Sequence, residues 1–256
     1  MRYVTICYFT ATGNSLYAAR QIGGTLLSIP QLMRQETVQI EDDAVGIVCP
    51  CFNCEMPMMV REFMRKAHIR TGYFFFIYTY GSGLGEAYAY AKLAARAAGL
   101  NLSYVNAVLM VNNFIPFYDI QEQLDTLAEK KVEKQLQKIR DDISLRVTVY
   151  FKVTVTMKAQ MNMYHKKVAE PWLRKDSALS YTVNNSCTRC GICAAVCPAN
   201  NISVTAEGVR FSDHCEVCYA CLHHCPRGAI HMKQEAGTKR FRNEHVSLYD
   251  ITEANQ

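Results

Sequence analysis

The chain has 256 residues, of which 50% are hydrophobic and 20% are charged, and its formal net charge is +5. This composition excludes a disordered or fibrous protein, and the length is sufficient for one good hydrophobic core and a smaller second one. The first residues lack the apolar run of a signal peptide, and the longest apolar stretch, residues 73–80, is too short to cross a bilayer. We therefore expect a soluble, cytoplasmic protein without a transmembrane segment.

The N-terminal part alternates strand-like and helix-like segments. Strands are predicted over residues 2–9, 44–50, 72–80 and 101–111, and helices over residues 15–22, 58–68, 86–98 and 120–143. The last helix has apolar residues at three- and four-residue spacing. This alternation predicts an α/β fold with a parallel sheet that is covered on both faces.

The loop after the first strand has the composition of a phosphate site. Thr10, Thr12, Gly13, Asn14 and Ser15 precede or open the first helix, where backbone N–H groups, hydroxyls and an amide face a helix N-terminus. No lysine follows, as a P-loop would require, and no G-x-G-x-x-G pattern of a dinucleotide site is present. An ordinary capped helix is the alternative interpretation.

Residues 144–180 form a basic connector whose structure the sequence leaves open. Residues 146–158 alternate as in a strand, whereas the following segment, which contains Trp172, is helical or irregular in character. Between Thr126 and Asp176 there are twelve Lys or Arg and six Asp or Glu, a local excess of six positive charges. These cations form either a solvated face or a surface that docks against an acidic redox partner or the chain's own cofactors.

The chain contains twelve cysteines, eight of which lie between Cys187 and Cys225. In a reducing compartment this number indicates metal or redox chemistry rather than disulfide bonds. The eight are arranged in an internal repeat, CTRCGICAAVCP and CEVCYACLHHCP. Short strand-like segments follow each unit, at residues 201–204 and 229–232.

Each unit reads C-x2-C-x2-C-x3-C-P, the spacing of bacterial ferredoxins, in which the fourth cysteine of one unit binds the other cluster. The pattern predicts two [4Fe-4S] clusters. One would be held by Cys187, Cys190, Cys193 and Cys225, and the other by Cys215, Cys218, Cys221 and Cys197.

Two alternatives explain this repeat less well. A zinc ribbon has no use for the third cysteine of each triplet, and a disulfide module does not suit a reducing compartment. His223 and His224 lie within the second unit, but every ligand position is already filled by cysteine. We expect the two histidines to be exposed or to support the cluster through hydrogen bonds.

The T-x-T-G-N-S loop resembles the FMN phosphate loop of flavodoxins, and the cysteine repeat resembles two-cluster ferredoxins. Together, in this order, they resemble the ferrodoxin family of flavodoxin–ferredoxin fusions found in anaerobes. The resemblance implies a flavodoxin-like, doubly wound five-stranded parallel sheet over residues 1–143 and a small α+β two-cluster ferredoxin domain over residues 181–235. Residues 236–256 would form a C-terminal tail.

The resemblance also implies an FMN site at the carboxyl ends of the strands. Thr10, Thr12, Gly13, Asn14 and Ser15 would hold the phosphate. The isoalloxazine would lie between two further loops, with Phe52 and Asn53 in one and Tyr80, Gly81, Ser82 and Gly83 in the other. The chain departs from the flavodoxin pattern of a stacked aromatic pair, because its only tryptophan, Trp172, lies in the connector.

Cys49, Cys51 and Cys54 form a second group of cysteines. Cys51 and Cys54 have the C-x2-C spacing of a redox dithiol, and three thiols would also suit a metal. The simpler interpretation is that small, soft side chains line a crowded flavin loop. Cys7 lies within the first strand and is expected to belong to the core.

No base, nucleophile or substrate pocket is evident from the sequence, so we predict an electron carrier rather than a substrate-specific enzyme. FMN and two [4Fe-4S] clusters would exchange electrons with redox partner proteins, and no motif indicates nucleic-acid binding. A flavin-dependent oxidoreductase that receives electrons through its ferredoxin domain is one alternative. A redox or iron sensor is another, although no output module accompanies the repeat.

Overall fold

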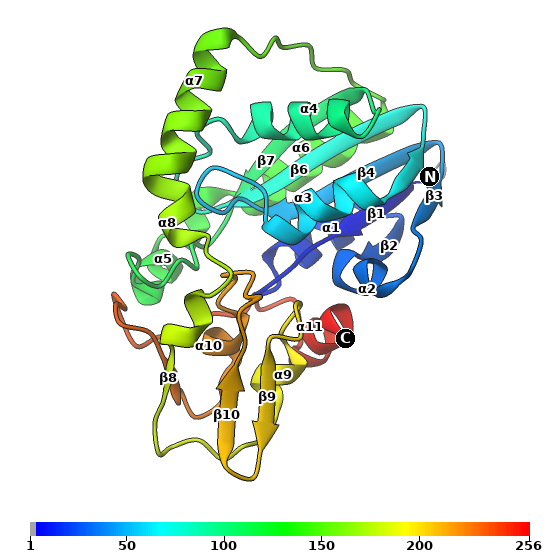
Figure 1. Cartoon of the computed structure of the whole chain (residues 1–256). Coiled ribbons are helices and arrows are strands. Elements are labelled where there is room, and N and C mark those ends of the chain that lie inside the picture. Colours follow the sequence, from blue (N-terminus) through cyan, green and yellow to red (C-terminus); the bar gives the residue numbers. More distant parts are fainter. Residues whose placement is uncertain (1–3) are drawn as a thin grey trace.

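The computed structural model describes residues 4–256 (Figure 1). Its central feature is a five-stranded parallel sheet with the strand order β2 (Thr25–Ser28), β1 (Val4–Tyr8), β4 (Ala44–Pro50), β6 (Tyr73–Tyr80) and β7 (Leu102–Leu109). Residues 2 and 3 of the first predicted strand lie outside the described residues. The doubly wound order 2-1-3-4-5 is that of flavodoxin-like folds. The predicted α/β class is therefore confirmed.

Helices cover both faces of this sheet. Figure 1 shows α1 (Asn14–Ile22) and α6 (Val132–Ser144) on one face, and α3 (Met58–Lys66) and α4 (Ala87–Ala97) on the other. In α4, Ala87, Ala91 and Ala95 are fully buried at a spacing of four residues, so one small-residue stripe faces the strands. The strands themselves are buried on both sides, which explains their continuous apolar runs.

The structure contains short elements that the sequence pattern did not predict. The edge strand β2 has only four residues and leads into α2 (Ile29–Arg34), and β3 (Gln39–Glu41) pairs in parallel with β5 (His68–Arg70). Segments of three or four residues are too short for hydrophobic periodicity to identify them.

The single helix predicted over residues 120–143 is wrong. The segment divides into α5 (Ile120–Asp125), a 3-10 turn (Leu127–Lys130) and α6, and Lys131 at the break has a φ of 48°. A left-handed residue cannot continue an α-helix, so the apolar spacing alone overestimated the helix length.

The connector runs along the outside of the sheet domain. Residues 147–154 are extended but belong to no strand, and Val149 N–H donates to the Ser103 carbonyl at 2.8 Å. The chain then forms α7 (Val155–Tyr164), a π-helical turn (His165–Ala169) and α8 (Glu170–Trp172). Residues 146–158, whose alternation resembles that of a strand, therefore form no strand, and the last residues of this segment belong to α7.

The cysteine-rich part is a small α+β unit. It contains β8 (Thr182–Val183), α9 (Ile192–Ala195), β9 (Ile202–Thr205), β10 (Gly208–Phe211), α10 (Ala220–His224) and β11 (Ile230–His231). β9 pairs with β10, and β8 pairs with β11, both antiparallel. The strand-like segments predicted after the two cysteine units correspond to β9 and β11.

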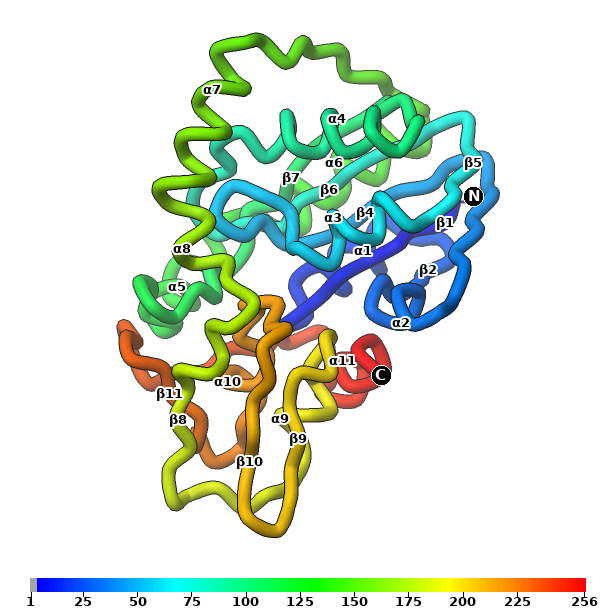
Figure 2. Tube along the Cα trace, in the orientation of Figure 1, coloured from blue at the N-terminus to red at the C-terminus, as the bar shows by residue number. Residues whose placement is uncertain are grey.

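The C-terminal segment returns to the start of the chain, as Figure 2 shows. Its helix α11 (Leu248–Asn255) packs beside α2, and its N-cap Ser247 and Asp250 form a capping box. Before it, Asn243 N–H donates to the Thr12 carbonyl at 2.8 Å. Among the described residues, no helix combines the length and the apolarity needed to cross a membrane.

Candidate functional site

A cavity of about 400 Å³ lies at the carboxyl ends of the parallel strands. Loops that follow four of the five strands line it, because these strand ends meet at one edge of the sheet. The predicted residues that line the cavity are Thr10, Thr12, Asn14, Ser15, Phe52, Asn53, Tyr80, Gly81, Ser82 and Gly83. Gly13 is the exception, since it packs against the C-terminal segment.

The loop between β1 and α1 presents a helix N-terminus to this cavity. Gly13, the N-cap residue, has a φ of 99° and carries no side chain that could cap the first N–H groups of α1. Its N–H donates to Thr10 Oγ1 at 3.2 Å, and Asn113 Nδ2 donates to Thr12 Oγ1 at 2.6 Å. These contacts fix the conformation of the loop. The first N–H groups of α1 have no side-chain cap and lie at the positive end of the helix dipole, an arrangement that fits a phosphate.

The two loops predicted to hold the isoalloxazine contact their neighbours closely. The 51–55 loop is a tight turn, in which Phe52 and Glu55 exchange two backbone hydrogen bonds of 2.8 and 2.9 Å. Gly81 lies so close to Asn112 that an added Cβ would be 2.2 Å from the Asn112 Cβ. The loop after β6 therefore depends on glycine where it meets the loop after β7.

Three tethers hold the 51–55 loop to the rest of the molecule. Glu55 is fully buried and pairs with Arg61 of α3 and, at 2.6 Å, with His165 Nδ1 of the connector. Cys51 N–H donates to the Thr79 carbonyl at 2.9 Å. The buried carboxylate thus joins the loop, a sheet-covering helix and the connector at one point.

An aromatic wall closes one side of the cavity, and the sequence did not identify it. It consists of Phe114, Phe117, Trp172 and Tyr219, all of which line the cavity. The Trp172 ring lies edge-on to Phe114 and Phe117 at centroid distances of 5.5 and 5.2 Å, and Phe114 lies 5.8 Å from Tyr219.

The location of Trp172 in the connector therefore does not separate it from the cavity, because the turn before α8 returns the chain to the sheet edge. The switch-point rule could have indicated the loop after β7, residues 112–118, as a further wall. Nothing in the local sequence indicated the long-range contacts of Trp172 or Tyr219.

The eight cysteines of the repeat divide between two further cavities. One is lined by Cys187, Cys190, Cys193 and Cys225, and the other by Cys197, Cys215, Cys218 and Cys221. This is the crosswise grouping that the spacing predicts. Within residues 4–256, no three His, Cys, Asp or Glu side chains are arranged to hold a single metal ion. A cubane instead binds each thiolate to a different iron, so its ligands surround a volume.

The chemistry of both cavities fits iron–sulfur clusters. Backbone N–H groups point at sulfurs in each cavity, with Val217 donating to Cys215 Sγ at 3.2 Å in one and Ala229 donating to Cys225 Sγ at 3.2 Å in the other. Burial raises the pKa of the Cys193 and Cys215 thiols to about 11. Thiolates at such sites require a bound cation, which ligated iron would supply.

The second cysteine unit has a strained backbone where it meets the large cavity. Val217 and Tyr219 have φ values of 52° and 58°, and both line that cavity. The first unit has Gly191, φ 81°, at the position equivalent to Tyr219. A left-handed tyrosine costs about 1–3 kcal/mol relative to a relaxed backbone, so its aromatic contacts must offset this strain.

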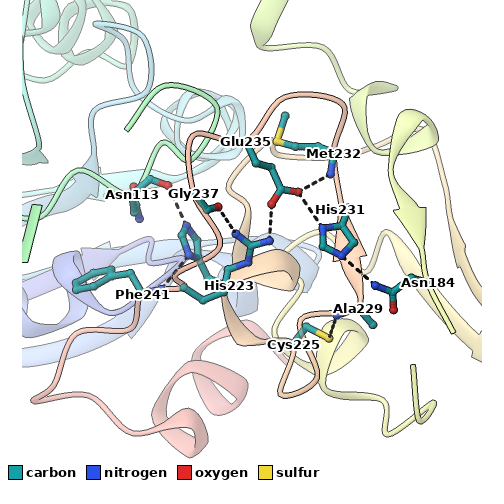
Figure 3. A network of polar contacts seen from close by, with 11 residues as sticks. Asn113, Asn184, His223, Cys225, Ala229, His231, Met232, Glu235, Gly237 and Phe241 are labelled. Carbon is teal, nitrogen blue, oxygen red and sulfur yellow. Dashed lines mark hydrogen bonds and ion pairs between the residues drawn. The ribbon is translucent and has the colours of Figure 1, made fainter. Parts of the chain in front are cut away.

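His223 joins three parts of the chain, as Figure 3 shows. Its Nε2 contacts the Asn113 carbonyl at 2.9 Å, and its Nδ1 accepts from Phe241 N–H at 3.1 Å. Burial lowers the pKa of His223 to about 3, so the ring is neutral and donates from Nε2. Both nitrogens therefore have protein partners. His224 is also buried, so of the two alternatives expected for these histidines, exposure is wrong, and support of a cluster stays a prediction.

The remaining cysteines differ in position. Cys7 and Cys49 are fully buried in the sheet core, and burial raises the pKa of the Cys7 thiol to about 12. Cys51 and Cys54 line the large cavity and are partly buried. Burial also raises the pKa of Cys54 above its ordinary value, which disfavours a reactive thiolate.

Comparison with known proteins agrees with part of this description. A family model for a 4Fe-4S binding domain matches residues 181–203, so the chain carries a [4Fe-4S] ferredoxin motif there. No curated protein matches the chain.

Three solved structures resemble about half of this chain at low identity. A candidate flavoprotein from Bacteroides uniformis is 13% identical, with a TM-score of 0.33, over 48% of this chain and 96% of its own. One from Bacteroides eggerthii is 17% identical, with a TM-score of 0.31, over 50% and 99%. A short-chain flavodoxin associated with a non-canonical PDU bacterial microcompartment is 14% identical, with a TM-score of 0.32, over 55% and 99%.

Proposed function

We propose that this protein transfers electrons between FMN, bound at the carboxyl edge of the sheet, and two [4Fe-4S] clusters bound by the cysteine repeat. Thr10, Thr12, Asn14 and Ser15 would surround the phosphate. The aromatic wall and the loops after β4 and β6 would enclose the isoalloxazine. Cys187, Cys190, Cys193 and Cys225 would hold cluster I, and Cys197, Cys215, Cys218 and Cys221 would hold cluster II.

One observation carries this proposal. Tyr219 lines both the large cavity and the cavity of cluster II, so the two sites share a wall. At this wall the second unit places Tyr219 in a left-handed conformation for which the first unit uses Gly191, so the large side chain is kept despite the backbone strain. A fold that merely joined two independent domains would not require this contact, whereas electron transfer between their cofactors does.

The bound cofactors would supply the redox chemistry, with FMN able to exchange two electrons and each cluster one. The chain's own residues would bind and enclose them. Glu55 and His165 hold the 51–55 loop, and His223 fixes the cluster unit against the loop after β7. The wall that Tyr219 shares between the two sites favours an electron carrier.

The test uses protein purified without oxygen. We expect about eight iron atoms and one FMN per chain, and reduction of both cofactor types in an anaerobic titration. Cys197→Ser and Cys218→Ser, which are distant in sequence, should weaken the same cluster in electron paramagnetic resonance spectra. Cys193→Ser, only four residues before Cys197, should affect the other cluster.

The outcomes separate the parts of the proposal. About four iron atoms per chain in the wild type would refute two clusters, and loss of one common signal in the Cys193 and Cys197 variants would refute the crosswise ligation. Failure to bind FMN in a titration of the flavin-depleted protein with clusters intact would refute the flavin site.

A further inference from the structure

The two cysteine cavities differ in their access to solvent. Cys197, Cys218 and Cys221 are buried, whereas Cys190 is exposed and its neighbours Thr188 and Arg189 are exposed as well. Figure 1 shows the chain between β8 and α9, which carries this group, at the end of the molecule away from the five-stranded sheet. Cluster I is therefore the more accessible of the two proposed clusters.

The connector covers one side of the large cavity, the proposed FMN site, which is called the flavin cavity below. Val168, Trp172 and Leu173 of the connector line it, and Phe114 and Phe117 pack against the tryptophan. Tyr219 separates it from cluster II on another side. A large redox partner can approach cluster I directly, while the connector and the cluster unit both border the flavin cavity.

Positive charge surrounds the accessible cluster site. Arg189 and Arg227 line its cavity, both are exposed, and no carboxylate lines it. Neither arginine forms a salt bridge within residues 4–256, and the Arg189 guanidinium donates to the Ala206 carbonyl. The adjacent carboxylate, Glu207, accepts from Thr205 Oγ1 at 2.6 Å instead. Neither arginine is therefore paired with a carboxylate, and both side chains are exposed on the side from which a partner would approach.

We propose that this face, defined by Thr188, Arg189, Cys190, Pro226 and Arg227, is the docking surface for a redox protein with an acidic surface, and that electrons pass there through cluster I. This inference rests on the proposed function. Opposite charges would orient the partner and raise its association rate, and the bidentate geometry of arginine suits carboxylates. The connector runs from α7 beside the sheet domain down to the cysteine unit, where the Lys175 carbonyl accepts from Cys215 N–H at 2.7 Å. None of its basic residues lines the cavity of cluster I, so the connector is not part of this face.

The test uses the complete, cluster-loaded protein and small electron acceptors of opposite charge. The reduced protein transfers one electron to cobalt(III), giving cobalt(II), from either the anionic cobalt–EDTA complex or the cationic hexaamminecobalt complex. Arg189→Gln/Arg227→Gln should slow oxidation by the anionic complex about fivefold at low salt, since each charge about 8 Å away contributes about twofold in water. Oxidation by the cationic complex should become faster, and both effects should fade near 0.5 M salt, where the Debye length is only about 4 Å.

The matched control removes the same charge elsewhere. Arg96→Gln/Lys152→Gln changes two exposed cations at a separate cavity beside α4 and the connector, and it should leave both rates unchanged. Poly-L-glutamate, as a probe for an acidic protein surface, should bind the wild type and the control variant with equal affinity in calorimetry. It should bind the Arg189/Arg227 variant about fivefold more weakly.

Iron content and cluster spectra decide whether the proposed function itself holds. If all variants contain both clusters but Arg189→Gln/Arg227→Gln does not alter the rates, or the control alters them equally, the docking surface is refuted. If the wild type lacks cluster I, the proposed function fails instead.

Discussion

Replacing Trp172 tests whether the connector completes the flavin cavity. In Trp172→Ala, the edge-on contacts with Phe114 and Phe117, at 5.5 and 5.2 Å, are lost together with the ring face available to the flavin. Stacking between an aromatic side chain and a planar base is worth about 1–3 kcal/mol. At about 1.4 kcal/mol for each factor of ten, we expect the dissociation constant of FMN to rise about 5- to 150-fold.

The assay is a fluorescence titration of flavin-depleted protein with FMN under anaerobic conditions, with iron content measured in each sample. Trp172→Phe should retain most of the affinity because it keeps an aromatic ring. Tyr150→Ala is the matched control, since Tyr150 also lies in the connector but is 79% exposed. Wild-type affinity in Trp172→Ala, or an equal loss in Tyr150→Ala, would refute the assignment of Trp172 to the flavin site.

Three further substitutions test other parts of the structure. Gly81→Ala places a Cβ 2.2 Å from the Asn112 Cβ, so FMN affinity should fall about tenfold or more. Gly72 does not line the cavity and an added Cβ would be 3.8 Å from its nearest neighbour, so Gly72→Ala should bind FMN normally. Asn255→Ala removes the 2.9 Å hydrogen bond to the Val196 carbonyl. Leaving this buried carbonyl without a partner should destabilise the docking of α11 by about 1–3 kcal/mol and lower the hydrogen-exchange protection of that helix. Asp250→Asn removes the carboxylate of the α11 capping box and its contact with α1, and should cost about 1 kcal/mol in the same measurement at pH 7.

The Asp250 prediction includes a pH dependence. The hydrogen bond from Arg20 holds the pKa of Asp250 below its ordinary value of 3.8. A lowered carboxyl pKa stabilises the fold above the unfolded pKa, and the contribution is lost as the pH falls through the folded pKa. The difference in α11 protection between wild type and Asp250→Asn should therefore stay constant from pH 8 to pH 5. A decline within this range would contradict the reasoning.

The other two predictions have direct controls. Tyr249→Ala, in which the replaced side chain of α11 is 70% exposed, should leave the hydrogen exchange of that helix nearly unchanged, unlike Asn255→Ala. Equal protection in the Asn255 variant and the wild type would show that this amide does not hold the C-terminal helix. Equal FMN affinity in the Gly81 and Gly72 variants would show that the loop after β6 adjusts without affecting the cavity.

Local patterns in the sequence determined the α/β class, four of the five strands of the main sheet and the grouping of the cysteines in two cavities. Phosphate binding by the loop after β1 stays a prediction. Each of these depends on residues that are close in the chain. The repeated C-x2-C-x2-C-x3-C-P spacing is rigid enough to predict which four cysteines share a cavity, and the parallel strand order brings the predicted loops to one edge. Short strands such as β2 were not predicted because three or four residues carry too little periodicity to identify a strand. The break at Lys131 was not predicted because the apolar spacing continues across it.

Tertiary structure alone decided how the two halves meet. Trp172 reaches the cavity only because the connector folds back through α7 and α8, and Tyr219 lies between two sites only because the cluster unit packs against the loop after β7. The C-terminal segment contacts the Thr12 loop across more than 200 residues of sequence. Such contacts depend on the packing of whole elements, and single-sequence patterns report only the conformation of neighbouring residues, so they could not have revealed the shared wall between the proposed cofactors.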